Sequence, residues 1–354
     1  MGVLIVMLGF SYYLNDPIDS ETEKYFKSMS EHTFREVFTS LHIPEDDPRI
    51  KTTRMKDLMK LSEYYGLSVV VDVDKSSLSY LPQNISSKLT LRLDDGFTPE
   101  DIKNISTEMP VALNASTIDK TLYQQLQESN VEINNIEAWH NFYPRPETGL
   151  DDNWFKSKNQ WLKSLGFKTQ AFIPGDKHLR GPIHSGLPTL ESQRDKNLLA
   201  SSIELDKLGI DKVIIGDPYL SVDYRKKFKE YYIQKTLSLN YCPIDDSNRE
   251  RLERMTYSNR PDPARDVVRI KESRMLKLAS ITPQNTVERT KGSITTDNKR
   301  YGRYMGEIQI AKRNLPNDDR INVLGHISKS DLDLIDLIGP NQKIKFNYFE
   351  RMEN

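Results

Sequence analysis

Cysteine and histidine are scarce in this 354-residue chain, which contains one cysteine and six histidines. A single cysteine cannot form a disulfide within the chain, and this favours a reducing compartment such as the cytoplasm. Cys242 stands beside Pro243 without a Cys–His pattern, so we interpret it as a structural thiol and not as a nucleophile. The sequence also lacks His-Glu-x-x-His, Cys–His clusters, EF-hand spacing, a P-loop and a Gly-x-Gly-x-x-Gly after any strand. We therefore expect no metal and no cofactor.

Long hydrophobic runs and an excess of one charge are also missing. Residues 1–10 are apolar, but they have no basic flank and no cleavage site, so they are typical of a buried first strand and not of a signal peptide or membrane span. The 50 basic and 51 acidic residues give a net charge of −1. This balance favours neither nucleic acid nor an anionic membrane as a partner. Nothing in the sequence sets an oligomeric state.

Short apolar runs recur along the first 217 residues, and each is followed by a polar segment. Continuous apolar strands of this kind suit a parallel sheet that is buried on both faces. The eight runs are Leu4–Phe10, Phe34–Leu41, Leu67–Val73, Leu89–Leu93, Val111–Asn114, Ile136–Trp139, Thr169–Ile173 and Val213–Gly216.

The segments between these runs carry helix signals. Thr98 precedes Pro99, as a capping residue precedes a proline at the first helical position, and Gly66 and Gly166 follow helical patterns as C-terminal stops. The segment Lys75–Gln83 has the weakest helical pattern. Eight strand–helix repeats predict an α/β fold, a (β/α)8 barrel, with an open doubly wound sheet as the alternative.

The pattern changes after Asp217, where a charged helical segment, Tyr224–Tyr232, precedes short β-branched or alternating runs. These runs predict a small, mostly β second domain. We therefore place a barrel domain at 1–238 and a β domain at 239–354. The predicted strands of the second domain are Lys235–Tyr241, Arg254–Tyr257, Thr286–Thr290, Ser293–Thr296, Met305–Ala311, Ile321–Ile327 and Lys343–Tyr348.

Polar residues gather at the carboxyl ends of the predicted barrel strands, where barrel enzymes build their active sites. The opposite ends are ordinary turns such as Tyr65-Gly66. The polar residues, in strand order, are Ser11, Tyr12, Tyr13, Thr39, Ser40, His42, Asp72, Asp74, Arg92, Asp94, Asp95, Asn114, Ser116, Thr117, Glu137, His140, Asn141 and Asp217.

Three carboxylates are candidate catalytic groups. Glu137 lies within an apolar strand, which favours a raised pKa and a general acid; the alternative is a structural ion pair, for example with Arg92. Asp94 shares strand parity with Arg92, so both should point into the barrel mouth. An aspartate held by an arginine suits a base, a nucleophile or a cation stabiliser, and the alternative is a structural ion pair. Asp217 precedes Pro218, so a turn or cap competes with catalysis. Asp72 and Asp74 are better interpreted as caps of the next segment.

The stretch from Asn135 to Leu150 combines charged, amide and aromatic side chains in a way that a simple connection does not require. Such side chains can hydrogen bond to sugar hydroxyls or to an anion. The candidate binding residues from this stretch and the preceding strand are Asn114, His140, Asn141, Tyr143 and Arg145.

Three further arginines are candidates for binding an anion. Arg180 lies in the long loop after the seventh strand, a position where barrels often bind phosphate; the alternative is a solvated lid. Arg260 and Arg265 lie in the basic stretch N-R-P-D-P-A-R-D-V-V-R of the second domain. These two belong either to a solvated face or to a bidentate clamp on an anionic substrate group.

Many long motifs resemble the MupG-type 6-phospho-N-acetylmuramidases, and the resemblance runs nearly from end to end. The motifs include F-T-S-L-H-I-P-E-D-D, E-A-W-H-N-F-Y-P-R-P-E-T-G-L, P-G-D-x-x-L-R-G-P and K-G-S-I-T-x-D-N-x-x-Y-G-R-Y-M-G-E. The resemblance implies a TIM barrel followed by a cyclophilin-like β domain. It also implies a cytoplasmic glycosidase of peptidoglycan recycling that cleaves the β-1,4 bond of N-acetylmuramic acid 6-phosphate–N-acetylglucosamine.

Glycoside hydrolysis needs a proton donor and a second group that attacks, activates water or stabilises the oxocarbenium-like state. We expect Glu137 as the acid and Asp94 as its partner, with Asp217 in reserve. Retaining, inverting and substrate-assisted routes all stay open, the last through the acetamido group of the sugar. The phosphate and the lactyl carboxylate both need cations, for which the candidates are Arg145, Arg180, Arg260 and Arg265.

Two other functions are compatible with the same barrel. A phosphosugar isomerase or aldolase would require a metal site or a Schiff-base lysine at a strand end, where only the solvated Lys75 is found. A protein that binds a sugar or phosphosugar without catalysis is the third possibility. Cyclophilin-like architecture alone would not establish prolyl isomerase activity.

Overall fold

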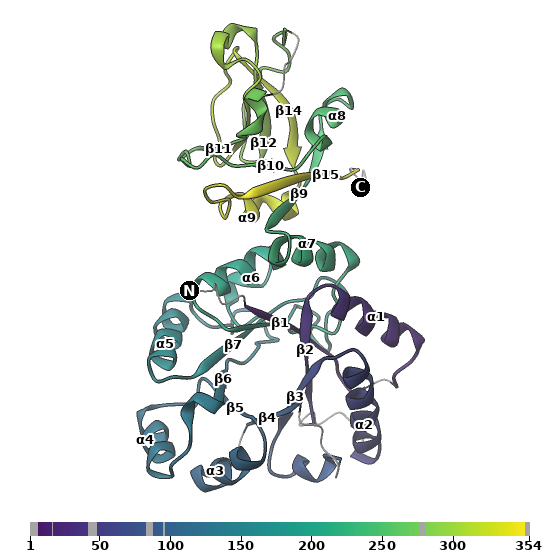
Figure 1. Ribbon diagram of the computed structural model, residues 1–354, viewed down its shortest axis with the longest axis vertical. Coiled ribbons are helices and arrows are strands. Elements are labelled where there is room, and N and C mark those ends of the chain that lie inside the picture. The colour runs from purple at the N-terminus through teal and green to yellow at the C-terminus, as the bar shows by residue number, and fades with distance from the viewer. Residues whose placement is uncertain are drawn as a thin grey trace. The chain divides into compact units, whose positions relative to one another are not determined.

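The computed structural model describes residues 6–15, 17–41, 48–82, 88–94, 96–275 and 280–350. The start of the first predicted strand, His42 and Asp95 lie outside these residues. The chain divides into two compact units, Met1–Arg225 and Lys226–Asn354 (Figure 1). This division falls within helix α7, Val222–Tyr232.

The first unit is a closed parallel barrel in which each strand pairs with the next one along the chain and β8 pairs with β1. Closure confirms the predicted (β/α)8 barrel and excludes the open doubly wound sheet. The strands are β1 Met7–Ser11, β2 Phe34–Ser40, β3 Ser68–Val73, β4 Leu89–Leu93, β5 Val111–Asn114, β6 Ile136–Trp139, β7 Lys168–Ile173 and β8 Lys212–Ile215.

Helices surround the barrel, and their starts follow the capping rules. Thr98 and Asp101 form a reciprocal capping box at the start of α3, and the carboxylate of Asp151 accepts a hydrogen bond at the start of α5. The predicted segment Lys75–Gln83 forms only a short 3-10 turn, Ser77–Tyr80. The helices are α1 Ser20–Glu31, α2 Pro48–Tyr64, α3 Pro99–Glu108, α4 Lys120–Glu128, α5 Asp152–Ser164 and α6 Leu198–Lys207.

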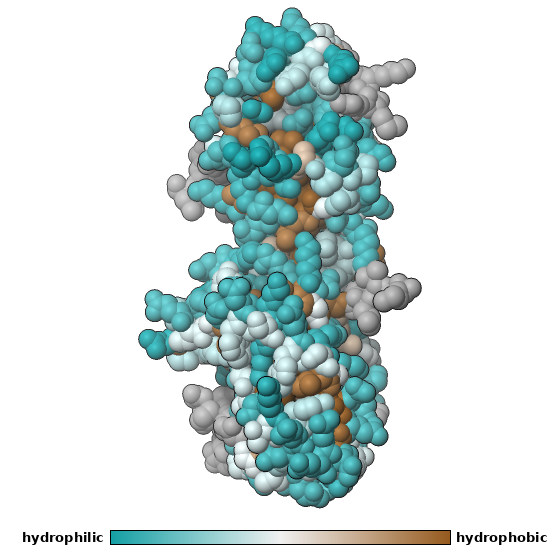
Figure 2. Space-filling model, turned by 90° about the vertical axis from the view of Figure 1, so that its left-hand side faces the viewer, coloured by the Kyte–Doolittle hydropathy of each residue, from teal (hydrophilic) through white to brown (hydrophobic). Residues whose placement is uncertain are grey.

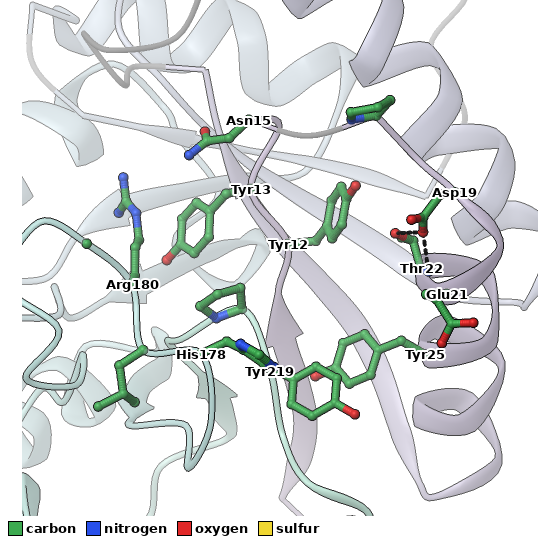
Figure 3. Close-up of a pocket in the computed structure, with 14 residues that line it drawn as sticks. Tyr12, Tyr13, Asn15, Asp19, Glu21, Thr22, Tyr25, His178, Arg180 and Tyr219 are labelled. Atoms are coloured by element: carbon green, nitrogen blue, oxygen red, sulfur yellow. Dashed lines mark hydrogen bonds between the residues drawn. The ribbon is translucent and has the colours of Figure 1, made fainter.

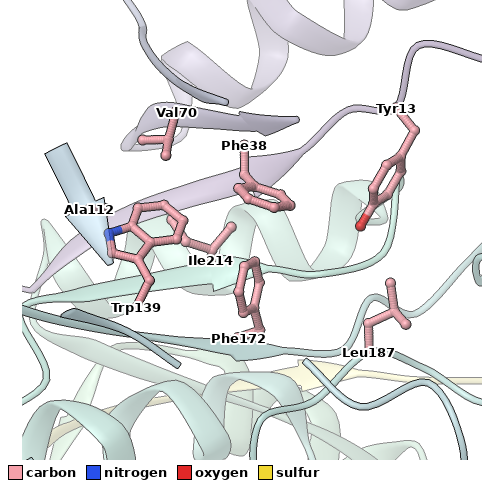
Figure 4. Close-up of a cluster of buried hydrophobic side chains, with 8 residues drawn as sticks. All are labelled: Tyr13, Phe38, Val70, Ala112, Trp139, Phe172, Leu187 and Ile214. Carbon is pink, nitrogen blue, oxygen red and sulfur yellow. The ribbon is translucent and has the colours of Figure 1, made fainter. Parts of the chain in front are cut away.

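A layer of aromatic side chains fills the centre of the barrel (Figure 4). The ring centroids of Phe38 and Phe172 are 5.1 Å apart, and those of Trp139 and Phe38 are 5.7 Å apart. Val70 and Ile214 pack against the same cluster. Polar inward-facing side chains are therefore divided into a set at the amino ends of the strands and a set at the carboxyl ends.

The second unit is built on a seven-stranded sheet in the order β10-β15-β9-β14-β12-β13-β11. This confirms a mostly β domain, and the predicted strands Ile321–Ile327 and Lys343–Tyr348 are found as predicted. The predicted strand Thr286–Thr290 is wrong, because only an isolated bridge between Arg289 and Leu315 occurs there. The elements are β9 Thr236–Pro243, α8 Ser247–Glu253, β10 Tyr257–Ser258, β11 Val267–Arg269, β12 Ser293–Asp297, β13 Ile308–Ala311, β14 Ile321–Ile327, α9 Leu332–Ile335 and β15 Lys343–Tyr348.

Hydrophilic residues cover most of the visible face of each unit in Figure 2, with small apolar areas between them. This agrees with the high proportion of charged residues, 29% of the chain. Among the described helices, none combines the length and the apolar character that a bilayer crossing requires.

Candidate active site

The polar set at the carboxyl ends of the strands is organised around Arg92 of β4, which is 4% exposed. Its guanidinium donates hydrogen bonds to Asp72 at the end of β3 and to the side-chain carbonyl of Asn141 after β6. The carboxylate of Asp94 lies 3.6 Å from Arg92 Nη1. Ser40 of β2 donates to Asp72 Oδ2 over 3.2 Å. Two carboxylates and an amide thus contact one buried cation, and a hydroxyl contacts one of the two carboxylates.

Strand register explains why these residues meet. Ser40 is paired with Asp72, and Asp72 with Arg92, across β2, β3 and β4. Alternate residues of a barrel strand point inward, so Arg92 and Asp94 share the inward direction, as predicted. Asn114 ends β5, and its Oδ1 accepts a hydrogen bond from the amide of Ser116 over 3.0 Å.

Glu137 lies near the amino end of its barrel strand, whereas we expected it near the carboxyl end. It is the second residue of β6 and lies two positions before Trp139, toward the amino end of that strand. Its carboxylate contacts Lys212 Nζ at 2.9 Å and accepts a hydrogen bond from Trp139 Nε1 over 2.7 Å. The structure therefore gives Glu137 the ion-pair role, with Lys212 in place of Arg92.

Glu36 completes this lower cluster, because its carboxylate contacts Lys212 Nζ at 2.7 Å. Burial raises the pKa of Glu36. Burial alone would lower the pKa of Lys212, but the charges of Glu36 and Glu137 outweigh it and raise that pKa. This lysine and its two carboxylates lie at the amino ends of the strands, away from the barrel mouth, which is the open end formed by the carboxyl ends of the strands. We therefore interpret the cluster as structural.

His140 does not face the mouth, which corrects its expected role in substrate binding. The side chain is fully buried, and its ring centroid lies 4.5 Å from that of Phe155 on α5. Neither ring nitrogen has a hydrogen-bond partner among the described residues. Burial, with a smaller effect from the charge of Lys158, lowers the pKa of His140 to about 3. A neutral imidazole packed between barrel and helix cannot hold a ligand at the mouth.

Asp217 is fully buried and is occupied by backbone amides. Its carboxylate accepts hydrogen bonds from the N–H groups of Gly175 (2.8 Å), Arg180 (2.9 Å) and Leu187 (3.1 Å). All three donors belong to the loop after β7. Asp217 therefore organises this loop through contacts with distant residues, which neither the catalytic interpretation nor the local turn or cap interpretation anticipated.

The second half of the stretch Asn135–Leu150 forms a surface loop whose backbone is bound by Arg194. Arg194 donates hydrogen bonds to the backbone carbonyls of Tyr143 and Arg145 and to the carboxylate of Glu191. The hydrogen bond from Arg194 holds the pKa of Glu191 well below its usual range, at about 2. Tyr143 is half-buried, whereas Arg145 is exposed. The sequence had not indicated Arg194, since a buried arginine after a proline-rich loop carries no motif.

A groove of about 510 Å³ opens beside the ends of β1 and β8 (Figure 3). Tyr12 and Tyr13 lie between Arg180 and His178 on one side and residues at the start of α1 on the other. The guanidinium of Arg180 lies over the ring of Tyr13, with its central carbon 4.1 Å from the ring centroid. Tyr13 also belongs to the barrel core, so the groove adjoins the barrel mouth.

Comparison with family models finds the 6-phospho-N-acetylmuramidase N-terminal domain over residues 8–230 and the C-terminal domain over residues 236–347. The chain belongs to the 6-phospho-N-acetylmuramidase family. It is therefore a glycosidase, as predicted. The two matches cover almost all of the two structural units.

Two solved structures are similar to the chain over nearly its whole length. A conserved protein of unknown function from a locus in Enterococcus faecalis is 35% identical, and the alignment covers 97% of this chain and 96% of that chain with a TM-score of 0.88. An uncharacterized B. cereus protein is 24% identical over 97% of this chain and 99% of that chain, with a TM-score of 0.73, and shows the same fold. No curated protein matches the chain.

The second unit of this family member contains Arg260 and Arg265. Arg260 Nε donates to Asp262 over 3.1 Å, and Arg265 Nε donates to Asp266 over 2.9 Å. The side chain of Arg265 is 83% exposed. Both guanidinium groups thus have a carboxylate partner within their own unit, and their contact with a substrate stays a prediction.

From the sequence we interpreted both Asp72 and Asp74 as caps of the following segment, but the structure gives the two residues different roles. Asp74 does cap the following turn, since its Oδ1 accepts a hydrogen bond from the amide of Ser77 over 2.7 Å. Asp72 instead joins the Arg92 cluster. The available signal was parity, because Asp72 and Val70 alternate with outward residues of β3 and so point into the barrel.

Proposed function

We propose that this 6-phospho-N-acetylmuramidase hydrolyses the β-1,4 bond of N-acetylmuramic acid 6-phosphate–N-acetylglucosamine at the carboxyl end of its barrel. The observation that carries the proposal is the pair of carboxylates, Asp72 and Asp94, on either side of Arg92. A glycosidase needs two acidic side chains near the scissile bond. Of the carboxylates we expected to be catalytic, Asp94 is the one that lies in this cluster.

Asp72 and Asp94 differ in how firmly they are held. Asp72 accepts hydrogen bonds from both Arg92 and Ser40, so its carboxylate is fixed and suited to stabilising positive charge or to orienting the acetamido group of the sugar. The contact between Asp94 and Arg92 is longer, and the Asp94 side chain is 23% exposed. Of the two, Asp94 is therefore the better donor of a proton to the leaving oxygen. This assignment moves the acid role from Glu137 to Asp94, which we had expected to be the partner of the acid.

The neighbouring amides complete the proposed site. Asn141 lies against Arg92, and Asn114 ends the adjacent strand β5, so both side chains can meet sugar hydroxyl or acetamido groups. Such a reaction would release N-acetylmuramic acid 6-phosphate and N-acetylglucosamine. We place it in the cytoplasmic recycling of peptidoglycan, in keeping with the single cysteine of the chain.

The direct test is incubation of the protein with the phosphorylated disaccharide and with its unphosphorylated counterpart, followed by chromatography and mass spectrometry of the products. We expect the phosphorylated disaccharide to be split into its two sugars. Intact disaccharides in both reactions, from a folded sample, would overturn the proposal and favour a phosphosugar-binding protein. Equal rates on both would show that the phosphate is not recognised.

A further inference from the structure

We propose that Arg180, held over Tyr13, binds the 6-phosphate of the substrate and that Asp217 is the residue that positions it. This inference rests on the proposed function and names the group that makes the site selective for a phosphorylated sugar. It concerns the side of the barrel mouth formed by β1, β7 and β8, and it assigns no role in bond cleavage to Arg180.

Arg180 differs from the other arginines named around the mouth because it combines partial burial with the absence of a carboxylate partner among the described residues. Arg92 is engaged by carboxylates, and Arg194 is paired with Glu191. Arg145 is exposed to solvent. Arg180 is half-buried against an aromatic ring and makes no ion pair within the described part of the chain. The N–H donors of such a half-buried guanidinium can bind an anionic ligand in a bidentate manner.

Tyr13 provides a fixed base for this guanidinium. Its hydroxyl donates a hydrogen bond to the carbonyl of Gly216 over 2.7 Å, and its side chain is 6% exposed. Burial raises the pKa of Tyr13 to about 12, so the ring stays a neutral phenol. Stacking on a fixed ring limits the rotamers of Arg180 and lowers the entropy lost when an anion binds.

Asp217 holds the backbone from which Arg180 projects. Besides the Arg180 amide, it binds the amides of Gly175 and Leu187 at the two ends of the loop. A second carboxylate, Asp176, accepts a hydrogen bond from the amide of Ser221 over 2.8 Å and ties the loop to the segment after β8. The position of Arg180 is thus set by a buried carboxylate that is itself out of reach of the substrate.

The charges of the groove orient an anion toward Arg180. Asp19 and Glu21 lie on the α1 side, where they repel a phosphate, whereas Arg180 and His178 lie on the other side (Figure 3). Loops after the seventh and eighth strands commonly bind phosphate in this fold. Arg180 follows β7 and the Arg92 cluster lies at the ends of β3 and β4, so both belong to the carboxyl-end face of the same barrel, where the disaccharide would bind.

The lactyl carboxylate is the other anionic group that Arg180 could bind, and three ligands distinguish the two. Isothermal titration would measure the dissociation constants of N-acetylmuramic acid 6-phosphate, N-acetylmuramic acid and N-acetylglucosamine 6-phosphate. For Arg180→Gln we expect affinity to fall about 10- to 100-fold for both phosphorylated sugars and to change little for N-acetylmuramic acid. Arg180→Lys should recover part of the loss, because it retains the charge but not the bidentate geometry.

Asp217→Asn tests the positioning role, because an amide cannot accept all three backbone hydrogen bonds in the same way. We expect the dissociation constant to rise several-fold for the phosphorylated sugars and to change little for N-acetylmuramic acid. A purely structural role would weaken all three ligands alike. Arg35→Gln, at the amino end of β2, removes an arginine from the opposite end of the barrel and serves as the charge-matched control.

Two outcomes would overturn the inference while leaving the proposed function intact. In the first, the wild-type enzyme cleaves the phosphorylated disaccharide, and Arg180→Gln still prefers phosphorylated ligands as strongly as the wild type does. The other is an equal loss of affinity for N-acetylmuramic acid in Arg180→Gln, which would assign Arg180 to the lactyl carboxylate. Failure of the proposed function would be seen separately, as a wild-type enzyme that cleaves neither disaccharide.

Discussion

Arg92 shows how one side chain defines a polar site within an apolar barrel. A guanidinium that is 4% exposed needs polar partners, and two carboxylates and an amide at the ends of three strands contact its terminal nitrogens, whereas its Nε has no partner among the described residues. The parity of Arg92 and Asp94 was readable from the sequence. The involvement of Asp72 and Asn141 was not predicted, because it depends on the pairing of β3 with β4 and on barrel closure, which brings the segment after β6 to Arg92 although β5 lies between β4 and β6.

We expect Asp94→Asn to lower the turnover of the phosphorylated disaccharide by about 100-fold or more, since the amide cannot exchange the proton. Thermal stability should stay near that of the wild type, because the contact with Arg92 is long and partly exposed. Steady-state kinetics with purified variants measures the effect. Asp74→Asn is the matched control, since this residue caps a turn and should retain normal turnover. Wild-type rates in Asp94→Asn would remove Asp94 from the reaction.

Glu137→Gln should act on stability and not on chemistry. Lys212 keeps Glu36 as a partner, so we expect the free energy of unfolding to fall by about 1–2 kcal/mol. Turnover should stay within about threefold of the wild type, because the aromatic layer separates this carboxylate from the mouth. Urea denaturation and kinetics on the same samples test both statements. A hundredfold loss of turnover with unchanged stability would restore Glu137 as the acid.

His140 predicts an acid sensitivity with a defined sign. The folded protein holds the ring neutral, with its pKa lowered to about 3, whereas the unfolded chain takes up a proton near pH 6.5. The stabilising contribution of His140 is thus present above pH 6.5 and is lost as the pH falls toward 3. The loss approaches about 1.4 kcal/mol per pH unit within this window. His140→Leu should flatten the dependence of the unfolding free energy on pH between 6 and 4, and parallel curves would contradict this.

At the scale of elements, the loop after β7 illustrates what sequence patterns miss. Its glycines and charges were recognised, but its three-point attachment to Asp217 depends on the neighbouring strand β8. Close approach of backbones explains one glycine: a Cβ on Gly175 would lie 2.6 Å from the carbonyl oxygen of Tyr219 and 2.8 Å from Asp217 Cβ. The loop therefore has little freedom to shift.

Gly175→Ala should displace this loop, with a loss of about 1–3 kcal/mol in stability. If Arg180 depends on the loop, affinity for N-acetylmuramic acid 6-phosphate should fall in the same variant. Calorimetric melting and ligand titration measure the two effects. Gly339→Ala is the control, because a Cβ there would meet no atom within 4 Å. Unchanged melting of Gly175→Ala would show that the loop tolerates movement.

At the scale of the whole molecule, each unit has its own buried charges. In the second unit, Lys227 Nζ lies 2.9 Å from Asp331 Oδ2, and both side chains are almost fully buried. Asp331 also accepts a hydrogen bond from the amide of Asn240 over 2.7 Å. Asp331 thus connects the middle of α7 to β9 of the sheet, which makes this pair important for the stability of that unit.

Asp331→Asn removes a buried carboxylate that contacts the ammonium of Lys227, so the second unit should lose about 3–5 kcal/mol in unfolding free energy. Scanning calorimetry should show a transition of the second unit that moves to lower temperature while the barrel transition stays in place. Asp336→Asn breaks an ion pair with Lys291 in which the Asp336 side chain is 56% exposed, and it should shift the melting temperature little. A shift of both transitions together would show that the units unfold as one.

The sequence by itself determined the architecture, because eight apolar runs separated by helical segments have few packing solutions other than a closed barrel. It also determined that Arg92 and Asp94 share a face, since side chains alternate along a strand. Only the tertiary structure decided which polar residues meet. The position of Glu137 along the barrel axis depends on where β6 begins relative to the neighbouring strands. The outward direction of the His140 side chain is stabilised by its contact with Phe155 of α5. The role of Asp217 follows from hydrogen bonds with backbone amides that lie 30 to 42 residues away in sequence. These are contacts between distant segments, and local sequence patterns do not encode them.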